Sequence, residues 1–230
     1  MKIGILTLPL HINYGGYLQA FALKSILLEH GNEVYLIENK NLYGNLLKRG
    51  LRQIKDSFSL LLFYLGKKNK EAEFILKEKK ISIFKDNYMC PIVDISNSKT
   101  LNDLDIVIVG SDQVWRPWKG LCRNSLYFFL DFIKSTKTKK ISYAASFGID
   151  KWEYNPVETI QIKKLLQDFS IISVREDDGV SLLQDNLGLP SIRMCDPTLL
   201  LTKNDYLSTL RIHHPDNDRI SSYILEFFKR

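Results

Sequence analysis

Ile106-Val107-Ile108-Val109-Gly110-Ser111-Asp112-Gln113-Val114-Trp115-Arg116 is the stretch that decides the fold of this 230-residue chain. Its four consecutive β-branched residues, between Asp105 and Gly110, predict a short strand that is buried on both faces, as in a parallel sheet covered by helices. Gly110 lets the backbone turn, and a hydroxyl, a carboxylate and an amide follow it directly. Because ligands bind at the carboxyl ends of the strands in open α/β sheets, these side chains are candidates for a binding site. The alternative is a turn that caps a helix beginning near Gln113.

Strand and helix patterns of this kind alternate along about 200 residues. Such alternation is typical of α/β proteins and predicts a doubly wound, Rossmann-like parallel sheet with the strand ends on one edge. The predicted strands are 3–8, 34–37, 106–109, 140–145, 171–174 and 191–194, and the predicted helices are 17–30, 156–168 and 178–186.

Residues 40–100 differ from the rest, and we predict a mostly helical, basic insertion that covers one side of the sheet. Between Lys40 and Tyr88 there are 12 Lys or Arg and 5 Asp or Glu, a balance of +7, which leaves 20 against 21 in the remainder. This segment, with the apolar stretch 57–66, could contact an anionic membrane surface, and a solvated helical excursion is the alternative. The apolar stretch is too short to span a bilayer. No nucleic-acid motif accompanies the lysines, so we expect no nucleic-acid partner.

The composition is typical of a globular protein from a reducing compartment. Apolar residues make up 45% of the chain, which is enough for a sizeable core. The N-terminus lacks the charged and apolar regions of a secretory signal. The three cysteines are odd in number and form no Cys-x-x-Cys pair, which argues against a disulfide framework and a zinc site. We therefore expect a cytoplasmic protein without a bound metal. The alternative is a peripheral location at the inner face of the membrane.

The first predicted loop carries small and polar residues just before a helix. Asn13, Gly15 and Gly16 precede the predicted helix 17–30, where free backbone N–H groups and the helix dipole favour an anion or sugar hydroxyls. A plain tight turn fits these residues equally well. His11 lies in the same loop and is a candidate for proton transfer, because an unperturbed histidine titrates near neutral pH.

Two later strand ends carry further candidates. Ser146 and Gly148 follow the predicted strand 140–145, and Arg175 follows the predicted strand 171–174. A guanidinium binds a phosphate or carboxylate with two parallel hydrogen bonds, so Arg175 is the best candidate for holding an anion. The alternative for Arg175 is an ion pair with one of the acidic residues that follow it, which adjacency in sequence makes awkward. Trp115 either stacks against a sugar ring or anchors its loop in the core.

Five motifs in the same order resemble the blocks of the polysaccharide pyruvyl transferase family. The resemblance runs from residue 3 to about residue 206, with more divergence between 40 and 100. It implies the first half of a two-domain arrangement like that of the GT-B glycosyltransferases, whose active site lies in the cleft between two Rossmann-like domains. The motifs are Asn13-Tyr14-Gly15-Gly16-Tyr17-Leu18-Gln19-Ala20, Gly110-Ser111-Asp112-Gln113-Val114-Trp115, Ser142-Tyr143-Ala144-Ala145-Ser146-Phe147-Gly148, Ile172-Ser173-Val174-Arg175-Glu176 and Asp196-Pro197-Thr198-Leu199-Leu200.

The resemblance implies that pyruvate is transferred from phosphoenolpyruvate, as a ketal, onto a sugar of a capsule, exopolysaccharide or cell-wall glycan precursor. The acceptor would be linked to a nucleotide or a lipid, and no further cofactor is implied. The donor anion needs fixed cations, and the reaction needs a general acid and a general base. We expect Asp112 and His11 in proton transfer, Arg175, Ser146 and Gly148 in donor binding, and Asn13, Gly15, Gly16, Ser111, Gln113 and Trp115 in acceptor binding.

Two other functions stay open at this point. One is a GT-B-like glycosyltransferase that uses a nucleotide sugar, and the other is a non-catalytic carbohydrate-binding domain.

In this interpretation a domain boundary lies between residues 201 and 202. Residues 1–201 are predicted to form the Rossmann-like domain. Thr202 with Asp205 resembles a capping box that opens a short helix. Residues 202–230 are predicted to contain this helix, a connector and, at 222–228, the first strand of an incomplete second domain. We therefore expect little or no transferase activity from the chain alone and a partner chain that supplies the second domain.

Overall fold

The structure of the chain is a computed structural model, and it describes residues 1–8, 14–39, 70–117 and 126–211. The chain divides into two units, 1–200 and 201–230, which are described separately. The first unit contains every strand of the described residues. The second contains the helix α7 (Lys203–Thr209).

The centre of the first unit is a six-stranded parallel sheet in the order β3-β2-β1-β4-β5-β6. This order confirms the predicted doubly wound sheet, because chain order runs outward in both directions from β1 and β4. The two central strands therefore form the topological switch point, at whose carboxyl end α/β proteins bind ligands. The strands are β1 (Lys2–Leu6), β2 (Glu33–Glu38), β3 (Ile92–Asp94), β4 (Ile106–Val109), β5 (Lys139–Ser142) and β6 (Phe169–Ile171).

The two central strands are buried on both faces, as their apolar sequences predict. Ile5 in β1 and Val107 and Val109 in β4 have no exposed surface. The register places Leu6 beside Val109, so both strands end at the same level. The predicted strand 106–109 is therefore confirmed with its bounds.

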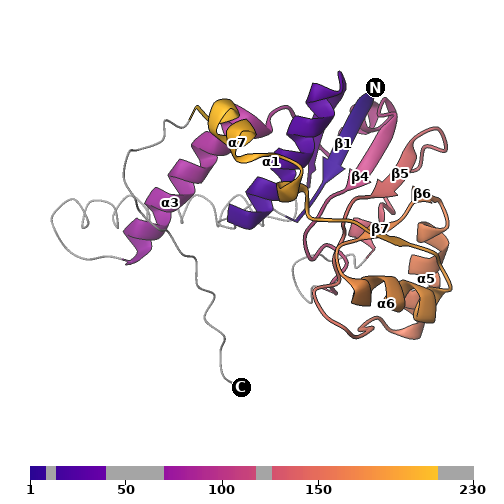
Figure 1. Ribbon diagram of the computed structural model, residues 1–230. Coiled ribbons are helices and arrows are strands. Elements are labelled where there is room, and N and C mark those ends of the chain that lie inside the picture. The colour runs from indigo at the N-terminus through magenta and orange to yellow at the C-terminus, as the bar shows by residue number, and fades with distance from the viewer. Residues whose placement is uncertain (9–13, 40–69, 118–125, 212–230) are drawn as a thin grey trace. The chain divides into compact units, whose positions relative to one another are not determined.

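Helices cover this sheet, and local sequence signals set several of their ends (Figure 1). The helix α1 (Tyr14–Glu29) is followed by Gly31 at φ 73°, in the left-handed region that favours glycine after a helix. The helix α3 (Lys70–Phe84) continues into a π-helical turn, Lys85–Met89, and the short helix α4 (Ser98–Asn102) follows. Figure 1 shows α1 alongside β1.

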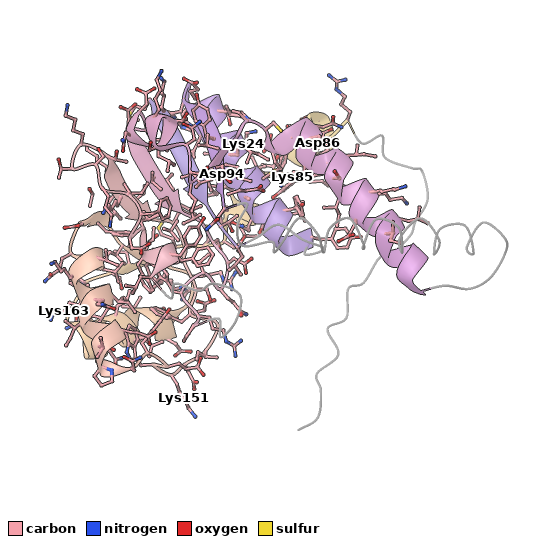
Figure 2. The ribbon with its side chains drawn as sticks, turned by 180° about the vertical axis from the view of Figure 1, so that it is seen from behind. Lys24, Lys85, Asp86, Asp94, Lys151 and Lys163 are labelled. Atoms are coloured by element: carbon pink, nitrogen blue, oxygen red, sulfur yellow. The ribbon has the colours of Figure 1, made fainter. Side chains whose placement is uncertain are left out.

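A buried lysine joins α1 to the π-helical turn. Lys24 is 4% exposed, and its Nζ atom donates to the carbonyl oxygen of Tyr88 at 2.8 Å and also to that of Cys90. Figure 2 labels Lys24 on α1, and Lys85 and Asp86 in this turn. Burial lowers the pKa of Lys24. The carbonyl acceptors that follow α3 therefore hold that segment against α1.

The helices after the sheet centre begin as their sequences predict. The helix α5 (Pro156–Leu166) has proline in its first turn and a capping box between Asn155 and Glu158. The helix α6 (Asp177–Leu187) is followed by Gly188 in the left-handed conformation. In the second unit, Thr202 and Asp205 form the predicted capping box of α7. Figure 1 shows α5 and α6 near β6 and β7.

The structure differs from the predicted elements in three places. The strand β3 lies within 40–100, where we expected mostly helix, and it forms an edge of the sheet. The predicted strand 171–174 is divided, because β6 pairs with β5 whereas β7 (Ser173–Val174) pairs with β8 (Ile192–Arg193) in a two-stranded sheet. The alternative of a helix beginning near Gln113 is wrong, because the residues after β4 form turns.

The remaining expectations fall outside the described residues. They concern the apolar stretch 57–66, most of the basic segment, the connector and the strand predicted at 222–228. Among the described helices, none has the length and apolarity that crossing a membrane requires.

Candidate active site at the carboxyl edge of the sheet

The ends of β4, β5 and β7 lie side by side and form one continuous framework. Single β-bridges join Asp112 to Ala145 and Ala145 to Val174. The backbone N–H of Ser146 donates to the carbonyl oxygen of Asp112 at 2.9 Å, and that of Arg175 donates to the carbonyl oxygen of Ala145 at 3.0 Å. The structure therefore brings together three of the four predicted strand ends.

Asp112 carries a carboxylate oxygen with no protein partner among the described residues. Its Oδ1 atom accepts a hydrogen bond from the Gln113 backbone N–H at 2.8 Å. Its Oδ2 atom is buried and accepts no hydrogen bond from any residue that the structure describes. Burial raises the pKa of Asp112 and outweighs the lowering effects of the Gln113 N–H and of the charge of Arg175. A carboxylate of raised pKa with an unused acceptor oxygen is suited to taking a proton.

Arg175 lies between two carboxylates. Its Nε atom is 2.8 Å from Oε1 of Glu176, and its Nη1 atom is 3.2 Å from Oδ2 of Asp196. The expectation that adjacency disfavours an ion pair with the next residue is therefore wrong. Partial burial acts to lower the pKa of Arg175, but the hydrogen bonds and charges of these carboxylates raise it overall. The side chain is 32% exposed, so it can still meet a ligand.

Two buried serine hydroxyls hold the carboxylates that flank Arg175. Ser111 Oγ donates to Oδ2 of Asp196 at 2.8 Å, and Ser146 Oγ donates to Oε1 of Glu176 at 2.9 Å. Neither serine has exposed surface. Ser111 was expected in acceptor binding and Ser146 in donor binding, but both hydroxyls donate to protein carboxylates. Their direct contribution in this structure is to fix those carboxylates.

Asp196 accepts hydrogen bonds both from this cluster and from the turn that packs against α1. Its Oδ1 atom accepts from the backbone N–H of Thr198 at 3.0 Å and from the Thr198 hydroxyl at 2.8 Å. The 3-10 turn Pro197–Leu199 that follows packs against α1. Burial acts to raise the pKa of Asp196, but the hydrogen bonds from Thr198, Ser111 and Arg175 lower it overall. Asp196 is therefore ionised beside Arg175.

Gln113 and Gly148 form a tight contact beside Asp112. Gly148 has φ 69°, and a Cβ atom on it would lie 2.5 Å from Cδ of Gln113. Oε1 of Gln113 accepts a hydrogen bond from Nη1 of Arg116 at 3.4 Å. Gly148 therefore leaves room for the Gln113 side chain, which in turn holds a second cation at this edge.

Trp115 anchors its loop in the core, which settles the two alternatives for this residue. The indole has no exposed surface, stacks on Phe129 with 5.5 Å between ring centroids, and donates from Nε1 to the Phe128 carbonyl oxygen at 3.1 Å. The Trp115 carbonyl oxygen accepts from the Tyr154 hydroxyl at 3.0 Å. Its assignment to acceptor binding is wrong for this structure, because no ring face is available for a sugar.

The start of α1 lies three residues earlier than predicted. Gly15 and Gly16 are in the first turn of α1 and not in a loop before it. Gly16 is buried, and its carbonyl oxygen accepts from Nε2 of Gln19 at 2.9 Å. Asn13 and His11 lie outside the described residues, so their proposed roles stay predictions.

Gln19 adds a polar side chain to the switch point. It is 3% exposed, and its Nε2 atom also donates to the Thr7 hydroxyl at 2.8 Å. Its Oε1 atom has no hydrogen-bond donor among the described residues and lies beside Gly110. Gln19 belongs to the first family motif, which was the available signal, but the sequence analysis did not include it among the candidate site residues.

Glu176, Asp196 and Arg116 are also site residues that sequence reasoning did not assign. Glu176 and Asp196 each follow a predicted strand within a family motif, which was the available signal. Arg116 is next to a motif. Their contacts join residues up to 85 positions apart, as Ser111 and Asp196 are, and no local pattern specifies such contacts.

The site combines one strongly held guanidinium with three carboxyl groups. A metal is not suggested by this arrangement: within the described ranges, no three His, Cys, Asp or Glu side chains are grouped so that they could hold one. The carboxyl oxygens suit hydroxyl groups, and the remaining N–H groups of Arg175 suit an anion. The arrangement fits a substrate pair that supplies both.

Comparisons with known proteins give one family and a distant structural similarity. The polysaccharide pyruvyl transferase family matches the chain over residues 13–230. No curated protein matches the chain. Two solved structures with 13% identity are an "alpha-glucosyltransferase in complex with UDP and a 13-mer DNA containing a HMU base" and an "alpha-glucosyltransferase in complex with UDP-glucose and DNA containing an abasic site". Each matches with a TM-score of 0.38 over 84% of this chain, and the match spans 41% of the glucosyltransferase chain.

Proposed function

Because the chain belongs to the polysaccharide pyruvyl transferase family, we propose that it takes part in transferring pyruvate from phosphoenolpyruvate, as a ketal, onto a sugar or glycan. The observation that carries this proposal is the pairing of Arg175, held by two carboxylates, with Asp112, whose Oδ2 atom is buried without a partner among the described residues. Asp112 follows β4 of the six-stranded sheet and Arg175 follows β7 of the two-stranded sheet, and single β-bridges through Ala145 hold these two strand ends side by side.

Ketal formation defines what the site must supply. One sugar hydroxyl adds to the carbon that carries the phosphate, and the methylene carbon becomes a methyl group by taking a proton. A second hydroxyl of the same sugar then displaces the phosphate. The two hydroxyl protons are balanced by the methyl group and the released phosphate. The reaction therefore needs a proton acceptor near the sugar hydroxyls and cations near the donor.

Asp112 is the proposed proton acceptor on the sugar side. Its raised pKa makes it a stronger base than an ordinary carboxylate at neutral pH. The Gln113 N–H holds Oδ1 and leaves Oδ2 for the hydroxyl. The Gln113 side chain lies beside Gly148, and we place the acceptor next to these two residues and Asp112.

Arg175 is the proposed cation on the donor side. A guanidinium has five N–H donors. Glu176 and Asp196 each accept from one of its nitrogens, Nε and Nη1. Among the described residues no acceptor is bonded to Nη2, which leaves that nitrogen for a phosphate or carboxylate oxygen. Because two carboxylates already offset the charge of Arg175, we expect additional cations to complete the donor site.

The test is to incubate the protein with phosphoenolpyruvate and candidate glycans, and to measure phosphate release and the mass of the glycan product. Since we expect little or no activity from the chain alone, we expect phosphate release and a ketal on the sugar when both the acceptor and a partner chain that supplies the second domain are added. A matched reaction with nucleotide sugars measures release of the nucleoside diphosphate. Glycosyl transfer without phosphate release would replace the proposal by a glycosyltransferase. Glycan binding without either reaction would replace it by a carbohydrate-binding domain.

A further inference from the structure

The contacts around Arg175 form two matched chains of hydrogen bonds. In one, Ser146 Oγ donates to Oε1 of Glu176, and the same oxygen accepts from Nε of Arg175. In the other, Ser111 Oγ donates to Oδ2 of Asp196, and the same oxygen accepts from Nη1 of Arg175. Each carboxylate is thus fixed by a serine on one side and bonded to the guanidinium on the other.

These two chains start from different strand ends. Ser111 follows β4, Ser146 follows the end of β5, and Arg175 follows β7. Both serine side chains are fully buried, so their hydroxyls cannot exchange these partners for water without local opening of the structure. The guanidinium is therefore restrained from two directions by a rigid frame.

We propose that Asp196 and Glu176 are positioning residues, which fix the orientation of the Arg175 guanidinium for an anionic ligand. The inference rests on the proposed function, because Arg175 is taken there as the donor cation. An arginine that is held by one carboxylate can still rotate about its side-chain bonds, so binding of an anion costs conformational entropy. Two fixed carboxylates hold the guanidinium in one orientation before the anion binds, which reduces this entropy cost.

Asp196 is the residue to change first. Asp196→Asn keeps the size of the side chain, and its amide oxygen can still accept from the Thr198 backbone N–H. The amide NH₂ then faces Ser111 and Arg175, where a donor replaces the acceptor. The change therefore removes the restraint on the guanidinium while it keeps the cap of the following 3-10 turn. Asp185→Asn is the matched control, because Asp185 is an exposed aspartate on α6.

The first measurement needs no substrate. Nitrogen-15 NMR of the arginine Nε–H group follows the hydrogen exchange of Arg175, whose signal is assigned by its loss in Arg175→Lys. We expect exchange to be faster by roughly tenfold or more in Asp196→Asn and unchanged in Asp185→Asn, because a charge-assisted hydrogen bond has been lost. Glu176→Gln should have a larger effect, since Glu176 accepts from Nε itself.

The second measurement is the affinity for phosphoenolpyruvate, and it separates this inference from the proposed function. We expect Asp196→Asn to bind the donor roughly tenfold or more weakly than the control variant. A wild-type protein that binds no phosphoenolpyruvate would reject the donor role, whereas the NMR result would still decide whether the carboxylates order Arg175. Unchanged exchange of Arg175 in both carboxylate variants, with the variants folded, would overturn the positioning role. If Asp196→Asn does not fold, Ser111→Ala weakens the same series of hydrogen bonds more mildly, because it removes only the serine hydroxyl that donates to Asp196.

Discussion

Ser142 at the end of β5 and Ser173 in β7 are joined by reciprocal hydrogen bonds. Ser142 Oγ accepts from the Ser173 backbone N–H at 2.8 Å and donates to the Ser173 carbonyl oxygen at 2.9 Å. Ser173 Oγ donates to the Ser142 carbonyl oxygen at 2.7 Å and accepts from the Ala144 N–H at 3.0 Å. Both serines are 2% exposed. This pair replaces the regular ladder where the six-stranded sheet ends and β7 begins.

Removal of one of these hydroxyls should destabilise the fold. In Ser173→Ala, the Ser142 carbonyl oxygen and the Ala144 N–H lose their partner in a buried place. We expect the free energy of unfolding to fall by about 1–3 kcal/mol. Urea unfolding measures this, with Ser170→Ala in the exposed part of β6 as the control. Equal stability of the two variants would contradict a structural role for the pair.

The buried indole of Trp115 gives a second prediction. Trp115→Ala removes the stack on Phe129 and the hydrogen bond to the Phe128 carbonyl oxygen, so we expect a loss of about 3–5 kcal/mol in the free energy of unfolding. Trp115→Phe keeps an aromatic ring and should cost less. Thermal and urea unfolding of both variants measure the effect. A Trp115→Ala protein of normal stability that binds glycans weakly would instead favour sugar stacking.

Gly148 is predicted to be required for two separable reasons. Gly148→Ala places a side chain in the left-handed region and brings its Cβ to 2.5 Å from Gln113. Gly188 is the matched control, since it has φ 65° and nothing lies within 4 Å of the position that a Cβ atom on it would take. We expect Gly188→Ala to cost about 1 kcal/mol and Gly148→Ala to cost more. Urea unfolding measures both.

The additional loss of stability in Gly148→Ala, compared with Gly188→Ala, should depend on the Gln113 side chain. In a double variant with Gln113→Ala, the methyl group gains room, so the two changes should be less than additive. Additive losses would show that backbone conformation alone requires the glycine.

The elements of the fold were predictable where local chemistry determines them. The β-branched run 106–109, the helix start at Pro156 and the capping box at Thr202 depend on residues close together in the sequence, and all three are present in the structure. The strand β3 is only Ile92-Val93-Asp94 after a charged helix, so its local signal is weak. The division of 171–174 was not visible, because one apolar run pairs with two different neighbours.

The location of the site was predictable from the sequence, but its hydrogen bonds and ion pairs were not. Strand ends at one edge follow from the parallel sheet, and the structure brings Asp112 and Arg175 to that edge. Glu176 is next to Arg175 in the sequence, whereas the contact with Asp196 depends on how the chain returns 21 residues later, which the sequence pattern does not contain. Trp115 was undecided for the same reason, since its burial depends on Phe129 and Tyr154.

Asp112→Asn should separate chemistry from stability. The amide oxygen can still accept from the Gln113 N–H, whereas the base is lost, so we expect turnover to fall more than acceptor affinity. Steady-state kinetics with varied acceptor measure this. A variant that unfolds would show that Asp112 is a structural turn.

The difference in stability between Asp112→Asn and the wild-type protein should depend on pH in a defined direction. Burial raises the folded-state pKa of Asp112 above its ordinary value of 3.8, so between these two values the folded protein holds more proton than the unfolded chain. This contribution to stability is present at low pH and is lost as pH rises through the raised pKa. Relative to wild type, Asp112→Asn should therefore gain stability from acidic to neutral pH. Urea unfolding across that range measures the difference, and an opposite slope would contradict burial as the dominant cause.

Arg175→Lys tests the proposed donor cation against a purely structural ion pair. Lysine keeps the positive charge but loses the fork, so it cannot bond Glu176, Asp196 and an incoming anion in the same geometry. We expect the affinity for phosphoenolpyruvate to fall roughly tenfold or more, because charge-assisted hydrogen bonds are lost. The melting temperature should change by only a few degrees, since a loss of 1 kcal/mol shifts it by about 2–4 °C in a chain of this size. Calorimetric titration and thermal unfolding give the two values. A large fall in melting temperature with unchanged donor affinity would assign Arg175 to the structure alone, as the link between Glu176 and Asp196.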